Sequence, residues 1–161
     1  MRLSFTFLFG ATLMKNALLH TFSEAATNSS ITTIEGIEEP TIFQYFETFN
    51  AGDFDATSQL FAREGMLQPP FEAIVTGSEA IAAYLQQEAT GFIFLPCQGQ
   101  KSVERGDLER DETDFLVLGR VQTPWFTVNV SWTFILNSNK QIILAKVNLL
   151  ASLKELMHMR R

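Results

Sequence analysis

Hydrophobic and polar residues alternate along the segment from residue 126 to residue 134. The apolar residues share one parity and have small polar residues between them: Phe126, Val128, Val130, Trp132 and Phe134. This alternation is typical of a strand with one face in the core. Pro124 has no N–H to donate to a strand ladder, so we expect Trp125 at a strand end or edge. Trp132 is then a core residue whose indole N–H, among apolar neighbours, needs an acceptor.

Helical periodicity dominates the segment before residue 90. After Pro40, apolar residues at spacings of three and four predict a helix that ends at residues 50–52 and faces inward with Ile42, Tyr45, Phe46 and Phe49. Asp53 is a suitable N-cap for a second helix, which we expect to carry Phe61 and to end at Gly65. Thr76 and Glu79 have the spacing of a capping box for a third helix. Its predicted inward face consists of Ile81, Tyr84, Leu85 and Glu88.

The second half of the chain has the pattern of a meandering sheet. Strands are predicted over residues 92–95, 115–122, 126–136 and 142–150, with a turn at residues 137–140. Helices followed by antiparallel strands are typical of an α+β fold. A curved antiparallel sheet around the helices forms a cone, and either side chains or a ligand can fill its apolar interior.

Composition and charge narrow the function. A chain of 161 residues with 46% hydrophobic content predicts one folded domain with appendages, and a net charge of −6 without a basic stripe argues against nucleic acid. One cysteine argues against a Cys-based zinc site and against an intrachain disulfide. Both histidines, His20 and His158, lie outside the expected domain. The fifteen phenylalanines indicate a large core or a large apolar cavity.

Residues 1–30 differ from the domain, which we expect over residues 31–161. A short basic start and an apolar run leave three readings open: a secretory signal, a later start of translation at Met14, or a membrane-surface helix. At the other end, Ser152 and Glu155 predict a short helical tail from about residue 152. We expect a cytoplasmic protein, with secretion or membrane association left open by the first segment.

Three residues are candidates for chemistry. The Tyr45 hydroxyl needs a partner, which is either a backbone carbonyl or an acceptor shared with Trp132, such as a ligand carbonyl. Glu88 on an apolar helix face reaches water, pairs with a cation of a partner, or acts as a catalytic carboxylate, but no histidine or second inward acid supports catalysis. Cys97 is expected in an exposed loop, either idle or forming an intermolecular, redox-sensitive disulfide.

Four segments resemble one known family. They are IEGIEEPTIFQYFETFNAGDFDATSQLF, LQPPF, GRVQTPWF and VNLLASLKEL. Together they resemble the C-terminal domain of the orange carotenoid protein family of cyanobacteria, over about residues 34–161. The resemblance implies the nuclear-transport-factor-like (SnoaL-like) cone. It also implies a water-soluble, non-enzymatic carrier that takes up a ketocarotenoid, such as canthaxanthin or echinenone, and delivers it to other carotenoid proteins, with a photoprotective or antioxidant role.

The resemblance also implies a site and partners. Tyr45 and Trp132 match the family's donors to the carotenoid keto group, and Trp125, with Thr123 and Pro124, matches a second contact. Candidate walls are Phe49, Phe92, Phe94 and Phe134. Glu88 matches a glutamate that pairs with an arginine of the helical domain. The implied partners are a second copy sharing one carotenoid, helical carotenoid proteins related to the family's N-terminal domain, and a membrane touched during uptake.

The chain departs from the family at two places. The hairpin between the two tryptophans is shorter, and Ala89 stands where a cysteine often follows the interface glutamate. Two rival functions remain at this point: an enzyme of the same fold, of the isomerase or cyclase type, and a dimerisation module. An enzyme needs an inward carboxylate or histidine as a base, for which Glu88 is the candidate.

Overall fold

A computed structural model of the chain describes residues 33–102 and 111–150. Within these ranges, two helices are followed by two strands and a third helix, and four strands come after them. In chain order the elements are α2 (Pro40–Asn50), α3 (Phe54–Gln59), β1 (Phe61–Gln68), β2 (Val75–Thr76), α4 (Ser78–Glu88), β3 (Ile93–Lys101), β4 (Thr113–Gln122), β5 (Thr127–Leu136) and β6 (Ile142–Leu150).

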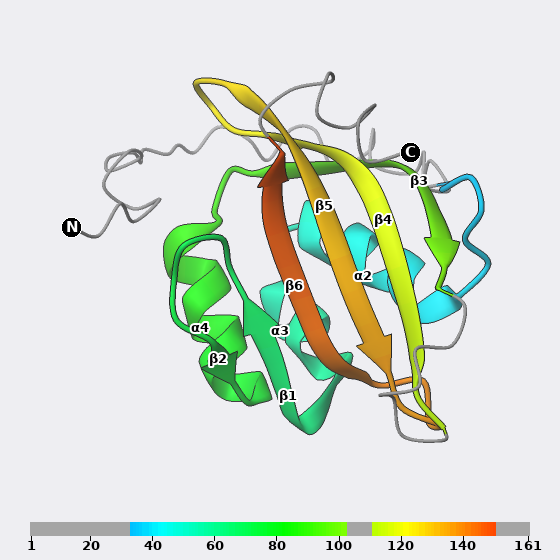
Figure 1. Cartoon of the computed structure of the whole chain (residues 1–161). Coiled ribbons are helices and arrows are strands. Elements are labelled where there is room, and N and C mark those ends of the chain that lie inside the picture. Colours follow the sequence, from blue (N-terminus) through cyan, green and yellow to red (C-terminus); the bar gives the residue numbers. More distant parts are fainter. Residues whose placement is uncertain (1–32, 103–110, 151–161) are drawn as a thin grey trace, which may run out of the picture.

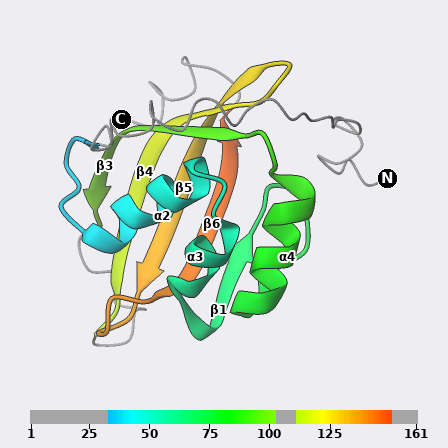
Figure 2. The same ribbon diagram turned by 180° about the vertical axis from the view of Figure 1, so that it is seen from behind.

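The six strands form one curved sheet in the order β2-β1-β6-β5-β4-β3. All neighbouring strands are antiparallel except β1 and β6, which run parallel. The three helices lie together on one face of the sheet, as the front and back views show (Figures 1 and 2). This arrangement confirms the predicted α+β cone.

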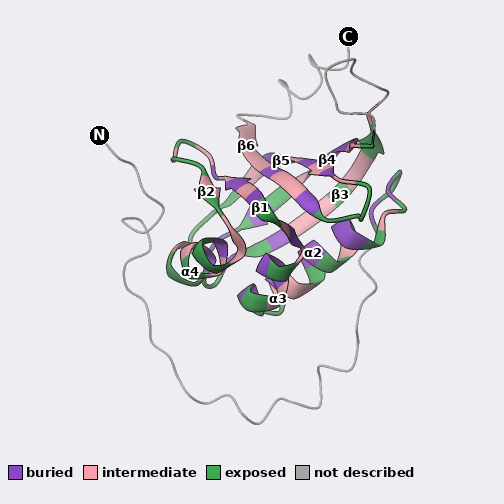
Figure 3. Cartoon of the chain, turned by 90° about the horizontal axis from the view of Figure 1, so that it is seen from below, coloured by how far each residue is buried: buried purple, intermediate pink, exposed green. Residues whose placement is uncertain are grey.

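The core lies between the sheet and the helices, where buried surface gathers in Figure 3. The predicted inward face of α2 is confirmed, because its four apolar residues are at most 1% exposed. From β5, Trp132 and Phe134 pack against this face and have no exposed surface. The alternation of β5 therefore holds from Val130 onward, whereas Phe126 is 40% exposed and precedes the strand.

The turn between β4 and β5 explains the exposure of Trp125. The Thr123 hydroxyl donates to the Phe126 carbonyl at 2.7 Å and accepts the N–H groups of Trp125 and Phe126 at 3.3 and 3.0 Å. These three bonds fold residues 123–126 into a tight turn. Trp125 is 57% exposed at the end of this hairpin, as the neighbouring proline predicted.

The predicted second helix is wrong in its C-terminal half. The helix ends at Gln59, and Phe61 begins a strand that was not predicted. The cause is a long-range contact, because this segment pairs with β6. The Ile142 N–H donates to the Leu60 carbonyl at 2.9 Å, and residues 66–68 pair with β6. Gly65 does not end a helix. A Cβ there would lie 2.6 Å from the Ile142 carbonyl oxygen, so only glycine allows β6 to approach.

Two further predictions are corrected. Thr76 does not cap α4, because it lies in β2 and pairs with Met66 of β1. Gly77 occupies the N-cap position with φ 92° and no side-chain cap. The strand predicted over residues 92–95 continues to Lys101, so Cys97 lies in β3 and not in a loop. Cys97 is exposed as expected, at an irregularity in the pairing with β4. The first segment and the tail from residue 152 lie outside the described residues.

Candidate ligand-binding site

A pocket opens between α2, α4 and the inner face of the sheet. It encloses about 570 Å³ of empty space, its open mouth included. Three of the sixteen lining residues carry a polar side-chain group, and they come from α2 and α4: Tyr45, Tyr84 and Glu88. The other walls are apolar side chains from β1, β3, β4, β5, β6 and the segments that follow β1 and α4. Such a pocket suits a largely hydrocarbon ligand with few polar atoms.

Tyr45 projects from the middle of α2 into the aromatic centre of the domain. Its ring contacts Phe46 and Phe134 at centroid distances of 5.4 and 4.9 Å. No hydrogen bond involves its hydroxyl among the described residues, and complete burial raises the pKa of Tyr45 far above its ordinary value. The group therefore stays protonated in neutral solution and remains a hydrogen-bond donor.

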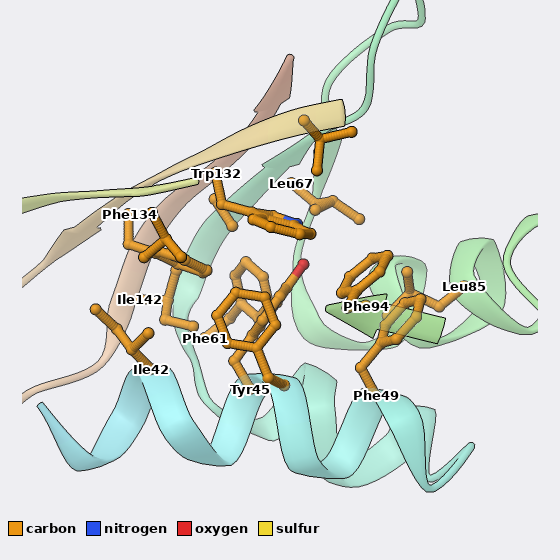
Figure 4. Close-up of a cluster of buried hydrophobic side chains, with 14 of the residues drawn as sticks. Ile42, Tyr45, Phe49, Phe61, Leu67, Leu85, Phe94, Trp132, Phe134 and Ile142 are labelled. Carbon is orange, nitrogen blue, oxygen red and sulfur yellow. The ribbon is translucent and has the colours of Figure 1, made fainter. Parts of the chain in front are cut away.

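Trp132 supplies a second donor at the same place. Its Nε1 atom is buried and has no hydrogen-bond partner. Figure 4 shows the indole nitrogen and the Tyr45 hydroxyl oxygen directed toward the same space between α2 and β5. A buried donor without a partner costs about 1–3 kcal/mol. Two converging donors without an acceptor therefore indicate an external acceptor atom.

Two acidic side chains lie near Tyr84 on the α4 side of the pocket. On α4, the Tyr84 hydroxyl donates to Glu72 at 2.6 Å, which ties α4 to the loop after β1. Burial, this hydrogen bond and the nearby charges of Glu72 and Glu88 raise the pKa of the Tyr84 hydroxyl. Glu88 lines the pocket one turn further along α4. Glu88 is therefore the one carboxylate among the lining residues of this pocket.

Some of the residues predicted from the sequence line this pocket, and others lie outside its lining. Tyr45, Phe49, Phe92, Phe94 and Glu88 line it. Trp132 and Phe134 lie outside the lining, within the aromatic cluster: Trp132 has its ring 5.1 Å from Phe94, and Phe134 has its ring next to Tyr45.

The remaining predicted residues stand apart from the lining. Thr123, Pro124 and Trp125 form the β4–β5 turn. Cys97 lies on the edge strand β3, where its carbonyl accepts the Glu35 N–H at 3.3 Å. Sequence reasoning placed Tyr84 on the inner face of α4 without assigning it to the site. It missed most of the walls because these come from segments far apart in the chain: Leu67, Pro69, Pro70, Val121, Val128, Val130, Val147 and Leu149.

Residues 33–102 and 111–150 hold no group of three or more His, Cys, Asp or Glu residues able to bind a metal ion. Within the same ranges, no helix has the length and apolar character that a membrane span requires.

Comparison with known proteins agrees with the fold. Residues 42–134 match the model of the SnoaL-like domain family. A ketosteroid isomerase-like protein from Erwinia carotovora atroseptica covers 78% of the chain with a TM-score of 0.54 at 14% identity, and 99% of that protein is covered. At that identity the likeness concerns the fold alone.

Higher similarity is found to orange carotenoid proteins. The chain is 38% identical over 133 residues to the orange carotenoid-binding protein of Limnospira maxima, which covers 78% of this chain and 40% of that protein. The structure of the Anabaena (Nostoc) sp. orange carotenoid protein, which binds canthaxanthin, superposes with a TM-score of 0.72 at 37% identity, over 79% of this chain and 40% of that one. The chain thus spans about 40% of the length of these relatives. It belongs to the SnoaL-like domain family and is a homologue of the C-terminal domain of the orange carotenoid proteins.

Proposed function

We propose that this protein binds a ketocarotenoid, such as canthaxanthin or echinenone, by inserting one end ring into the pocket. The observation that carries the proposal is the pair of donors at the aromatic centre, the unpartnered Trp132 Nε1 and the Tyr45 hydroxyl. A keto oxygen accepts hydrogen bonds and donates none, so it complements two donors. The apolar walls complement the ring and the polyene.

The proposed role is that of a carrier and not of an enzyme. The pocket is open at its mouth, and exposed apolar side chains lie close in sequence to pocket residues: Phe71 follows Pro70, and Ile93 follows Phe92. Such a surface suits transient contact with a membrane during uptake, with a second copy that covers the projecting half of the carotenoid, or with a helical carotenoid protein that receives it. Glu88 at the mouth would pair with an arginine of such a partner.

The rival is an enzyme of the same fold, and the observation that favours it is the carboxylate of Glu88 on the pocket wall. A general base must reach the proton that it abstracts. The converging donors lie at the aromatic centre, whereas Glu88 and Glu72 lie toward the mouth with Tyr84 between them. This arrangement suits recognition of an acceptor atom in the interior and a cation at the entrance better than proton abstraction.

Expression in a bacterial host that makes canthaxanthin tests the proposal. We expect an orange to violet protein that keeps its pigment through gel filtration. The same host without the carotenoid pathway provides the control. A colourless protein that is folded by circular dichroism would refute carotenoid binding. Turnover of a steroid or polyketide substrate that is abolished in Glu88→Gln would favour the rival.

A further inference from the structure

The Phe94 side chain occupies the middle of the aromatic cluster. Its ring stacks on Phe49 with a centroid distance of 3.5 Å and an interplanar angle of 9°. It also contacts Trp132 at 5.1 Å and Tyr45 at 6.3 Å. Figure 4 shows the stacked Phe49 and Phe94 rings beside the indole nitrogen and the Tyr45 oxygen. Phe94 thus touches both the pocket and the two donors.

The pocket in this state is too small for a carotenoid end ring. The volume that the centre of a water molecule can reach inside it is about 60 Å³. A cavity that accepts benzene measures about 150 Å³, and a methylated six-membered ring is larger than benzene. Phe94 lines the pocket whereas Trp132 does not, although their rings are in contact. The Phe94 ring therefore lies between the open space and the indole donor.

The backbone at Phe94 is held in place by one side chain. Asn50, the last residue of α2, accepts the Phe94 N–H at 2.7 Å and donates to the Phe94 carbonyl at 2.8 Å. Both backbone groups of Phe94 are therefore tied to the end of α2. A change at this position must be a rotation of the side chain, because the backbone is fixed from two sides.

We propose that Phe94 is an inner gate of the pocket and that Asn50 is the residue that positions it, an inference that rests on the proposed carotenoid site. In the empty protein the ring fills the place of the ligand's end ring and covers the Trp132 N–H. When a ketocarotenoid enters, the ring rotates away from Phe49 about its fixed backbone. The keto oxygen then reaches the two donors. Phe94 thereby decides how fast and how deeply a ring enters.

Quenching of Trp132 fluorescence by acrylamide tests the gate without any carotenoid. In a Trp125→Phe background, Trp132 is the single tryptophan of the chain. Phe94→Leu removes the ring and keeps an apolar side chain, so we expect the quenching constant to rise about two- to tenfold, the factor that corresponds to one aromatic pair. Asn50→Ala should raise it as well, although the ring is retained, because the backbone of Phe94 is released.

Phe46→Leu is the matched control. Phe46 contacts Trp132 at a centroid distance of 4.9 Å and is fully buried, but it does not line the pocket. Its truncation should cost similar packing and leave quenching unchanged. Unchanged quenching in a folded Phe94→Leu protein would overturn the gate, and so would an equal rise in both variants. If Phe94→Leu does not fold, Phe94→Met replaces it, since methionine is flexible and of similar volume.

Uptake of canthaxanthin from neutral phosphatidylcholine vesicles is the second measurement. Phe94→Leu should take up the pigment about two- to tenfold faster than the wild type, and Phe46→Leu at the wild-type rate. Faster quenching with unchanged uptake would show that the ring covers Trp132 but does not limit entry, which contradicts the gate. If neither protein takes up pigment, the proposed function fails, and the quenching comparison alone decides whether Phe94 shields Trp132.

Discussion

At the scale of single residues, the proposed site depends on two donors, the indole N–H of Trp132 and the hydroxyl of Tyr45, for which a bound keto oxygen would supply the missing acceptor. A polar group that is buried without a partner is rare in folded proteins. Here the Trp132 nitrogen and the Tyr45 hydroxyl face one space in an otherwise apolar core. Under the proposed function, the unpaired donors lower the stability of the empty protein and bind the ligand's acceptor atom when it enters.

Replacement of these donors tests the site. Tyr45→Phe and Trp132→Phe each remove one hydrogen bond and keep an apolar ring. Each change should weaken carotenoid binding by about 1–3 kcal/mol and shift the absorption of the pigment to shorter wavelength. Titration with canthaxanthin under visible spectroscopy measures both effects. Wild-type colour and affinity in the double variant would show that the keto group binds elsewhere.

The two tyrosines of the chain supply a test in alkaline solution. In the folded protein, burial raises the pKa values of Tyr45 and Tyr84 above the ordinary tyrosine value of about 10. A raised pKa means that the neutral form contributes its full stability below about pH 10, and that this contribution falls as the pH rises further. We expect no tyrosinate absorbance at 295 nm near pH 10 until the protein unfolds. If half of the tyrosinate absorbance appeared near pH 10 in the folded protein, one of the two tyrosines would not be buried. The Tyr84→Phe variant would then show which tyrosine ionises.

Cys97 provides a residue-scale test of association. Its thiol is exposed on β3, and it is the one cysteine of the sequence, so any disulfide must join two molecules. Mild oxidation should produce a dimer on non-reducing gels that is absent in Cys97→Ser, with carotenoid colour unchanged. A monomer under oxidising conditions would rule out this redox control.

At the scale of elements, the turn between β4 and β5 determines the exposed position of Trp125. One backbone bond closes it, from the Thr123 N–H to the Phe126 carbonyl at 2.8 Å, and the Thr123 hydroxyl adds three more by donating to that carbonyl and accepting two N–H groups. β5 begins directly after this turn and carries Val128 and Val130 into the pocket wall. The turn therefore couples an exposed aromatic residue to the inner surface.

Thr123→Val removes this hydroxyl and keeps the shape of the side chain. We expect a loss of about 1–3 kcal/mol in the free energy of unfolding and a change in Trp125 emission in a Trp132→Phe background, because the turn opens. Urea denaturation and fluorescence measure the two effects. Thr127→Val, at an exposed position in the same hairpin, should have little effect on either. Equal stability of the Thr123 variant and the wild type would show that the backbone alone holds the turn.

The pairing of β1 with β6 is the second decisive feature at this scale. The parallel pair brings the segment after β1 to the pocket, so that Pro69 and Pro70 line it together with Val147 and Leu149 of β6. Gly65 makes the approach of β6 sterically feasible. The wall of the site thus depends on contacts between segments more than seventy residues apart.

At the scale of the whole molecule, the open pocket has a consequence for stoichiometry. A carotenoid held by one end ring projects from the mouth, and exposure of its apolar half to water costs about 25 cal/mol per Å². A second copy placed mouth to mouth would cover it. We therefore expect a holo protein that sediments as a dimer with one carotenoid per two chains. A monomeric holo protein in analytical ultracentrifugation would contradict this arrangement.

Local periodicity and motifs were enough to predict much of this protein. The inward face of α2, the alternation of β5, the course of β6 and the exposed position of Trp125 follow from the spacing of apolar residues and from one proline, because each depends on neighbours within a few positions. The resemblance of four segments added the family and the two donors, Tyr45 and Trp132.

Long-range packing settled the remaining features. Phe61 lies in a strand and not in a helix because β1 pairs in parallel with β6. Thr76 does not cap a helix because it pairs with β1. The covering of Trp132 by Phe94, and the hold of Asn50 on Phe94, join residues 38 and 44 positions apart, as the contacts show. No pattern within one segment specifies such contacts, since they arise only when the curved sheet closes over α2 and packs the side chains of distant elements into one interior.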